Sequence, residues 1–147
     1  MIDSVHIIYV NNKTQQMWDI SAITTNIVVK SFRHGRAGSA VMTIVKHEEV
    51  QWELGSHVFI KVDGKDLFRG RITMINQTQA SLLSITVHDL LFYLVQNKET
   101  YVYHGKKASE VIEQICADKH IDIGTIEDTD HVIPVRTEDG QTLLDII

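Results

Sequence analysis

The eight histidines are the first residues whose chemistry needs an explanation, because imidazole is a common metal ligand. They are spread along the chain at His6, His34, His47, His57, His88, His104, His120 and His131. None of their spacings places two ligands on one helix face or in one loop, and a single cysteine cannot supply a thiolate cluster. His120 and Asp122 with His131 come nearest to a ligand set, and we interpret them as scattered surface residues. The sequence therefore predicts no metal site and no cofactor.

Cys116 is the one candidate thiol nucleophile. It could be paired with a histidine for covalent catalysis. However, it falls on the same apolar helical stripe as Ile112 and Ile115. A thiol buried among apolar side chains has a raised pKa and is unreactive. We therefore predict that Cys116 is a core residue.

An acidic segment and a basic segment are the remaining candidates for ligand binding. Glu127, Asp128 and Asp130 cluster in one stretch but lack the alternating oxygen ligands, central glycine and terminal glutamate of a calcium loop. We interpret that stretch as a solvated acidic loop. The basic loop Arg33–Gly38 contains two glycines and could hold a phosphate on backbone N–H groups. A protein contact and a plain solvated hairpin explain this loop equally well. Arg69 and Arg71, which share a strand face, could add to this basic patch.

The composition limits the class of protein further. The chain has 147 residues, a formal net charge of −5 and 44% hydrophobic residues, which excludes disorder and a disulfide scaffold. Its acidic balance argues against general nucleic-acid binding. The longest apolar run, Leu90–Val95, has six residues, far below the ~18 of a membrane span. Since no catalytic motif is recognisable either, we predict that the chain is not an enzyme.

The elements that position these residues follow from the hydrophobic periodicity. Up to about Val87 the apolar residues alternate with period 2 in about seven short runs. Asp63–Asp66 contains the strongest hairpin signal, and Asn76–Gln79 is predicted as a polar turn. These runs predict an antiparallel barrel or sandwich. We place its end at residue 96, which defines a first domain at 1–96.

After His88 the pattern becomes partly helical. Residues 108–120 show an apolar stripe with helical spacing, preceded by a strand candidate at Tyr101–Tyr103. Residues 132–147 repeat the order of strand, polar turn and helix. Leu90–Val95 is predicted to fold against the barrel as a short turn or strand. The predicted second domain, 97–147, is a partial α/β domain. Its last helix stops at Ile147 without a cap, so we expect this chain to be the N-terminal part of a longer protein.

Four stretches, in their order and spacing, resemble a known family. The stretches are Asp66–Ile72 (with an F-x-G-x-I core), Ser84–Leu94, Asn97–Tyr101 and Lys107–Ile112. They look like the N-terminal part of phage tail or baseplate hub proteins of the XkdQ (PBSX-like prophage) and late-control D type. The resemblance covers roughly residues 32–147. Many relatives have an aromatic residue before the aspartate, where this chain has His88.

The resemblance implies a mainly β fold with an α+β extension, in which an antiparallel tail-tube-like β-barrel precedes the start of a mixed α/β insertion domain. It also implies a structural, non-enzymatic role in the baseplate hub of a contractile phage tail or tailocin, joining the tail tube to the spike or tip. The implied partners are further copies in a trimer of the full-length protein, the tail tube protein, the spike or tip and other baseplate proteins. DNA would be only passing cargo, and no membrane is involved. The implied location is the virion, after synthesis in the bacterial cytoplasm.

Residue roles are expected for the fold and not for chemistry. We expect Phe68, Ile72 and Met74 to fill the barrel, Gly70 to admit a close neighbour, and Asp89 to hold the barrel-to-insertion junction by accepting backbone N–H bonds. The alternative function is a carbohydrate- or peptide-binding β module that binds cell walls. That alternative requires an exposed aromatic platform, for which Trp18 and Trp52 are the only tryptophans.

Overall fold

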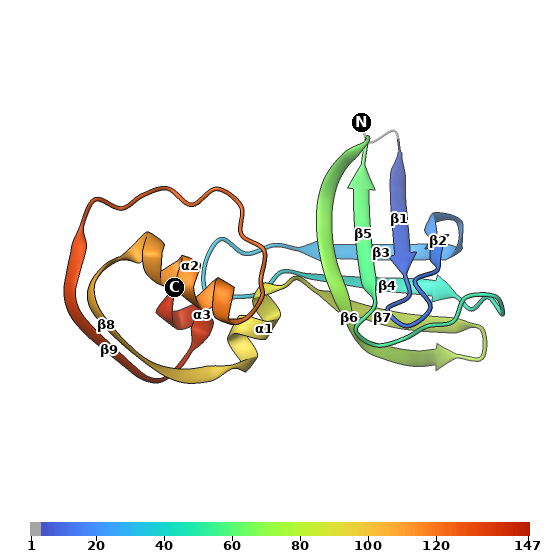
Figure 1. Cartoon of the computed structure of the whole chain (residues 1–147). Coiled ribbons are helices and arrows are strands. Elements are labelled where there is room, and N and C mark those ends of the chain that lie inside the picture. Colours follow the sequence, from blue (N-terminus) through green and yellow to red (C-terminus); the bar gives the residue numbers. More distant parts are fainter. Residues whose placement is uncertain (1–3) are drawn as a thin grey trace. The chain divides into compact units, whose positions relative to one another are not determined.

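The computed structural model describes residues 4–147 of the chain. It divides into two compact units, Met1–Leu90 and Leu91–Ile147. The first unit is built from strands and one short 3-10 helix, and the second combines a two-stranded sheet with helices (Figure 1).

The first unit is one seven-stranded antiparallel sheet with the strand order β2-β1-β5-β6-β7-β4-β3. Its elements are β1 (Val5–Val10), β2 (Met17–Asp19), the 3-10 helix η1 (Ser21–Ile23), β3 (Thr24–Lys30), β4 (Ser39–Val45), β5 (His57–Val62), β6 (Lys65–Gln79) and β7 (Leu82–His88). The mainly β fold with an α+β extension is therefore confirmed.

Period-2 alternation places the core of this sheet correctly in β7, because successive side chains of a strand point to opposite faces. Leu83, Ile85 and Val87 are all buried, as the sequence predicts.

The predicted hairpin is confirmed as well. Asp63 and Gly64 connect β5 to β6 with positive φ angles of 49° and 76°, the conformation that two-residue hairpin turns require.

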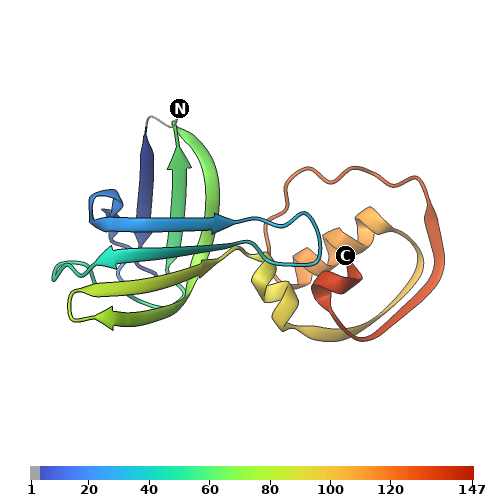
Figure 2. The same ribbon diagram turned by 180° about the vertical axis from the view of Figure 1, so that it is seen from behind.

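Strand β6 is longer than predicted and contains two irregularities. Its first part pairs with β5 and its second with β7, and the strand bends between the two (Figures 1 and 2). The register of β6 against β7 shifts between Ile72 and Met74, and again between Gln77 and Gln79. The prediction of a turn at Asn76–Gln79 is wrong, since these residues continue β6.

The first shift overturns one core prediction. Ile72 is only 2% exposed, whereas Met74 is 51% exposed. The extra residue, Thr73, reverses the parity of the strand, so that Ile75 and not Met74 packs against the core. The sheet curls around this core as a half-barrel, and its two edge strands are β2 and β3.

The second unit contains α1 (Leu91–Gln96), β8 (Lys98–Lys107), α2 (Ala108–Asp118), β9 (Val132–Thr142) and α3 (Leu143–Ile146). Strands β8 and β9 pair antiparallel as a two-stranded sheet. The predicted helix at residues 108–120 is confirmed as α2, with Val111, Ile115 and Cys116 buried. The predicted polar turn before the last helix is wrong, because residues 137–140 belong to β9.

The expectation of a turn or strand at Leu90–Val95 is also wrong. This segment forms helix α1, whose Leu94 is buried in a cluster with Tyr103, Val111, Ile115, Leu143 and Ile146. The helix therefore packs with the second unit, whereas we assigned it to the first domain. No helix in the described part of the chain is long and apolar enough to cross a membrane.

Candidate functional site

The end of β7 holds the residues to which the sequence assigns structural roles. One Asp89 carboxylate oxygen, Oδ2, accepts a hydrogen bond from the backbone N–H of Gly38 at 2.7 Å. The Asp89 N–H in turn donates to the Gly38 carbonyl at 3.1 Å. This reciprocal pair, the Asp89–Gly38 bridge, ties the loop between β3 and β4 to the last residues of the first unit. A side chain at Gly38 would meet Oδ2 of Asp89 at 2.7 Å, so the bridge depends on a glycine.

Gly70 lies beside the same strand end. A Cβ atom built there would collide with the carbonyl of His88, whose carbon lies at 2.8 Å, and with Val87 Cγ1 at 2.9 Å. Backbone atoms cannot move aside as the end of a flexible side chain can. Gly70 therefore lets β6 and β7 approach more closely than any other residue would allow.

Phe68 and Ile72 flank Gly70 on the inner face of β6, with 9% and 2% of their surface exposed. Phe68 also approaches Gly38, since a Cβ there would lie 3.4 Å from its ring. The structure thus brings Phe68, Gly70 and Asp89 together around one loop end. These contacts are apolar packing and backbone hydrogen bonds, which position strands and perform no reaction.

The residues with potential chemistry do not converge. Cys116 is 5% exposed, and burial raises the pKa of its thiol, so it lacks the environment of a reactive cysteine. Among residues 4–147, no three His, Cys, Asp or Glu side chains lie close enough together to hold a metal ion.

The acidic segment has a structural partner. Asp128 accepts a hydrogen bond from Lys107 Nζ at 2.7 Å and lies 3.3 Å from the Ser109 hydroxyl. The Lys107 hydrogen bond is the main cause of the lowered pKa of the Asp128 carboxyl. The long loop between α2 and β9 is therefore fastened to the start of α2, and a single carboxylate does not make a calcium site.

The two tryptophans do not form an exposed platform. Both are partly buried against the core and lie beside the buried Tyr9 ring, with ring centroids 5.5 Å away for Trp18 and 4.8 Å for Trp52. The Tyr9 hydroxyl donates to the Gln51 carbonyl at 2.8 Å and accepts from the Glu53 N–H. This cluster packs the first unit internally and leaves little aromatic surface for a sugar ring.

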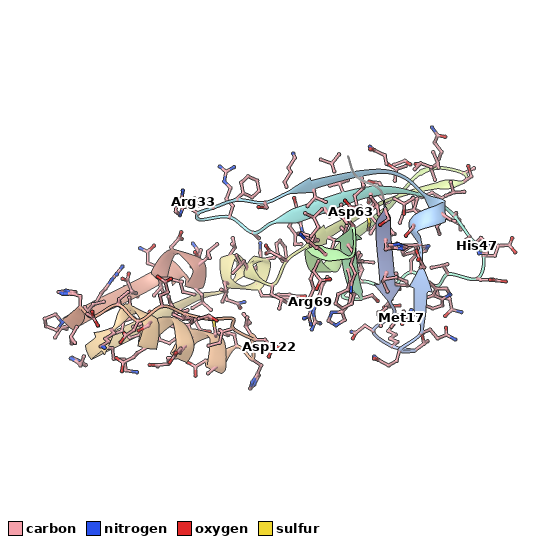
Figure 3. The ribbon with its side chains drawn as sticks, turned by 90° about the horizontal axis from the view of Figure 1, so that it is seen from above. Met17, Arg33, His47, Asp63, Arg69 and Asp122 are labelled. Atoms are coloured by element: carbon pink, nitrogen blue, oxygen red, sulfur yellow. The ribbon has the colours of Figure 1, made fainter. Side chains whose placement is uncertain are left out.

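The basic loop Arg33–Gly38 connects β3 and β4, with Arg33 at its outer end (Figure 3). Arg36 lies over the Phe32 ring at 5.7 Å from its centroid. Arg69 lies over the ring of Phe59 on β5 in the same way, at 5.3 Å from its centroid. Such cation–π contacts are common at exposed sites and bind no ligand by themselves.

Strand pairing reveals a set of basic side chains that the sequence did not bring together. Lys30 pairs with Ser39, Ser39 with His88, His88 with Arg71, and Arg71 with His57. Directly opposite residues of an antiparallel sheet share a face, so the cation row (the cations Lys30 and Arg71, together with the imidazoles of His88 and His57) crosses the outer side of five strands. Burial, followed by the charges of Arg71 and Arg69, lowers the pKa of His57. No local pattern could have found the row, because its members lie on different strands.

The chain is similar in sequence to two proteins of Bacillus subtilis. Over 94 residues it is 35% identical to the phage-like element PBSX protein XkdQ of Bacillus subtilis (strain 168), a match that covers 63% of this chain and 29% of that protein. Over 133 residues it is 28% identical to the uncharacterized protein YqbQ of the same strain, covering 87% of this chain and 40% of that protein. The chain thus spans less than half the length of either relative.

A solved structure has a similar fold. The 43 kDa tail protein of prophage MuSo2 from Shewanella oneidensis superposes with a TM-score of 0.72, covering 97% of this chain and 47% of that one at 14% sequence identity. Residues 27–147 match the YQBQ-like family, which is most of the sequence. The chain belongs to the YQBQ-like family.

Proposed function

We propose that this chain is a structural component of a phage tail, and more specifically of the baseplate hub that joins the tail tube to the spike or tip in a contractile phage or tailocin. The observation that carries the proposal is the half-barrel followed by the α/β unit, an arrangement matched over 97% of the chain by a phage tail protein. The relative named for the PBSX phage-like element supports the same class.

The physical properties of the first unit suit this role. A permanent assembly requires a rigid scaffold and large contact areas, ~2,000 Å² or more for each obligate interface. The half-barrel has a continuous core and two edge strands, β2 and β3, whose free backbone groups can pair with a neighbour. The packed tryptophans speak against a carbohydrate-binding module, and the scattered polar groups give no support to an enzyme.

The proposal is tested in the phage or prophage-bearing bacterium that encodes the chain. Antibody against residues 1–147, detected by immunogold electron microscopy, should label the tip end of purified tails. Deletion of the gene should abolish assembled tails, and a plasmid copy should restore them. Purified tails that lack the protein by mass spectrometry would contradict any tail role, whereas label along the whole tube would contradict the hub.

The oligomeric state provides a second test. We expect the full-length protein to form a trimer with the tube protein and the spike as its neighbours, and residues 1–147 alone to be monomeric or weakly associated. Multi-angle light scattering on both chains measures this directly. A stable trimer of residues 1–147 would show that these residues suffice for assembly.

A further inference from the structure

Three register rows cross the outer face of the sheet formed by β3, β4, β7 and β6. Here the outer face means the side opposite the buried core. The rows are Lys30–Ser39–His88–Arg71, Val28–Val41–Thr86–Met74 and Asn26–Thr43–Ser84–Asn76. None of these residues is Asp or Glu, although the chain carries 19 acidic residues against 14 basic ones. The absence of carboxylates from this face is therefore a local property and does not follow from the composition.

The two permanent cations of this row, Lys30 and Arg71, have no counter-charge in the part of the chain that the structure describes. Within residues 4–147, the side chains of Lys30 and Arg71 make no ion pair and no hydrogen bond, and the Arg71 Nε atom is buried without a partner. A carboxylate that approaches from outside the chain would supply the missing partner of Arg71.

An apolar row lies directly beside the cations. Val28 is 46% exposed, Val41 is 40% exposed and Met74 is 51% exposed, and all three share one register row with Thr86. Single exposed apolar residues are ordinary, but a contiguous row marks an interaction surface. The bulge at Thr73 creates this row, because it turns Met74 outward.

The combination selects one class of partner. Phosphates of DNA would use the cations but gain nothing from valine and methionine, and nucleic-acid binding needs a more extended basic surface. Arginine beside exposed apolar side chains is typical of protein interfaces. Building on the tail role proposed above, we propose that this outer face docks a neighbouring tail protein whose surface presents carboxylates beside an apolar strip. The cation row fixes the orientation of that partner, and the apolar row supplies the buried contact.

Chemical cross-linking in intact tails tests the proposal. A water-soluble carbodiimide joins a lysine amine to a carboxylate in direct contact, so the product identifies both residues. We expect Lys30 to be linked to an Asp or Glu of a different tail protein, and Met74 to be oxidised by peroxide more slowly in tails than in the isolated chain. Met17, 68% exposed on edge strand β2, serves as the reference methionine.

The contrary results are distinct. Lys30 linked only to another copy of this chain, or protection of Met74 that disappears after nuclease treatment, would overturn the proposed partner. Met74 as reactive in tails as in isolation would overturn the docking surface, while the presence of the protein in those tails would leave the tail role intact. Absence of the protein from the tails would overturn both.

Charge reversal gives an independent measurement. Lys30→Glu should lower the yield of assembled tails about tenfold or more, because it places a negative charge against the partner's carboxylates. Lys65→Glu, a reversal at an exposed lysine where β6 begins, is the matched control and should leave the yield unchanged. Equal urea midpoints for the two variants exclude misfolding as the cause. Equal tail yields for the two variants would overturn the proposal.

Discussion

The two units of this chain reach stability by different routes. In Met1–Leu90, seven strands enclose a large cluster of buried side chains, and each inner strand is held by neighbours on both sides. In Leu91–Ile147, a two-stranded sheet and three helices share a cluster of only six buried residues. A two-stranded sheet is marginal alone in water. The second unit therefore depends on its helices, whereas the first depends on strand register.

The chain carries natural reporters that separate the two units. Both tryptophans lie in the first unit, against Tyr9. The single cysteine, Cys116, lies buried on α2 of the second. Tryptophan fluorescence therefore follows unfolding of the sheet, and the rate at which Cys116 reacts with a thiol reagent follows opening of the helical unit.

The largest expected effect comes from truncating the core of the sheet. Ile72→Ala should lower the free energy of unfolding by about 4 kcal/mol, because a buried isoleucine is replaced by a cavity. Urea titration followed by tryptophan fluorescence measures the change. Met74→Ala, two residues later but outside the core, should cost under about 0.5 kcal/mol. If the two variants are equally destabilised, the bulge at Thr73 is misplaced.

The next effect tests the close approach of β6 and β7. Gly70→Ala should cost about 3 kcal/mol, since the new Cβ collides with the His88 carbonyl and the backbone has to move. Gly124→Ala, in the second unit with open space around it, should change stability by less than about 0.5 kcal/mol. The same urea titration compares them. A neutral Gly70→Ala would mean that the strands can separate at no cost.

A smaller effect is expected in the helical unit. Ile115→Ala should cost about 2 kcal/mol, at the low end for such truncations, because a small cluster of helices can relax around the gap. We expect Cys116 to react roughly tenfold faster or more, while the fluorescence midpoint stays unchanged. A lowered fluorescence midpoint alongside the faster reaction of Cys116 would show that the two units unfold as one.

The smallest effects concern one carboxylate in each unit. Hydrogen bonds from Ser21 hold the pKa of Asp19 below its usual value, and Lys107 does the same for Asp128. A lowered native pKa means that the stabilisation is complete above the unfolded pKa and is lost as pH falls through the native one. Carbon NMR titration should place both below about 3.9, the ordinary value. Ser21→Ala and Lys107→Met should each move only the matching pKa upward.

Much of the fold was predictable because its signals are local. Alternation in β7, the Asp63–Gly64 turn and the helical stripe around Ile115 each depend on neighbours in sequence, and each is confirmed. The errors have a common origin. Helix α1 forms because Leu94 finds a tertiary cluster, and β6 continues through polar residues because β7 pairs with it.

The candidate site divides in the same way. That Phe68 and Ile72 share a strand face could be read from their spacing, and that Asp89 bonds backbone N–H groups is an expectation from residue type. The sequence could not predict that Gly38, 51 positions away, is the hydrogen-bond partner of Asp89. The cation row was equally hidden, because Lys30 and Arg71 share a face only through the pairing of four strands.

Residue order by itself determined the hydrophobic period of each segment. With it came the fold class and, for most strands, which side chains face the core. The tertiary structure alone decided which strands are neighbours, in what register, and where one extra residue at Thr73 reverses the pattern. The physical reason is that alternation specifies faces within a strand, whereas register is set by turns, bulges and the fit of side chains from distant strands.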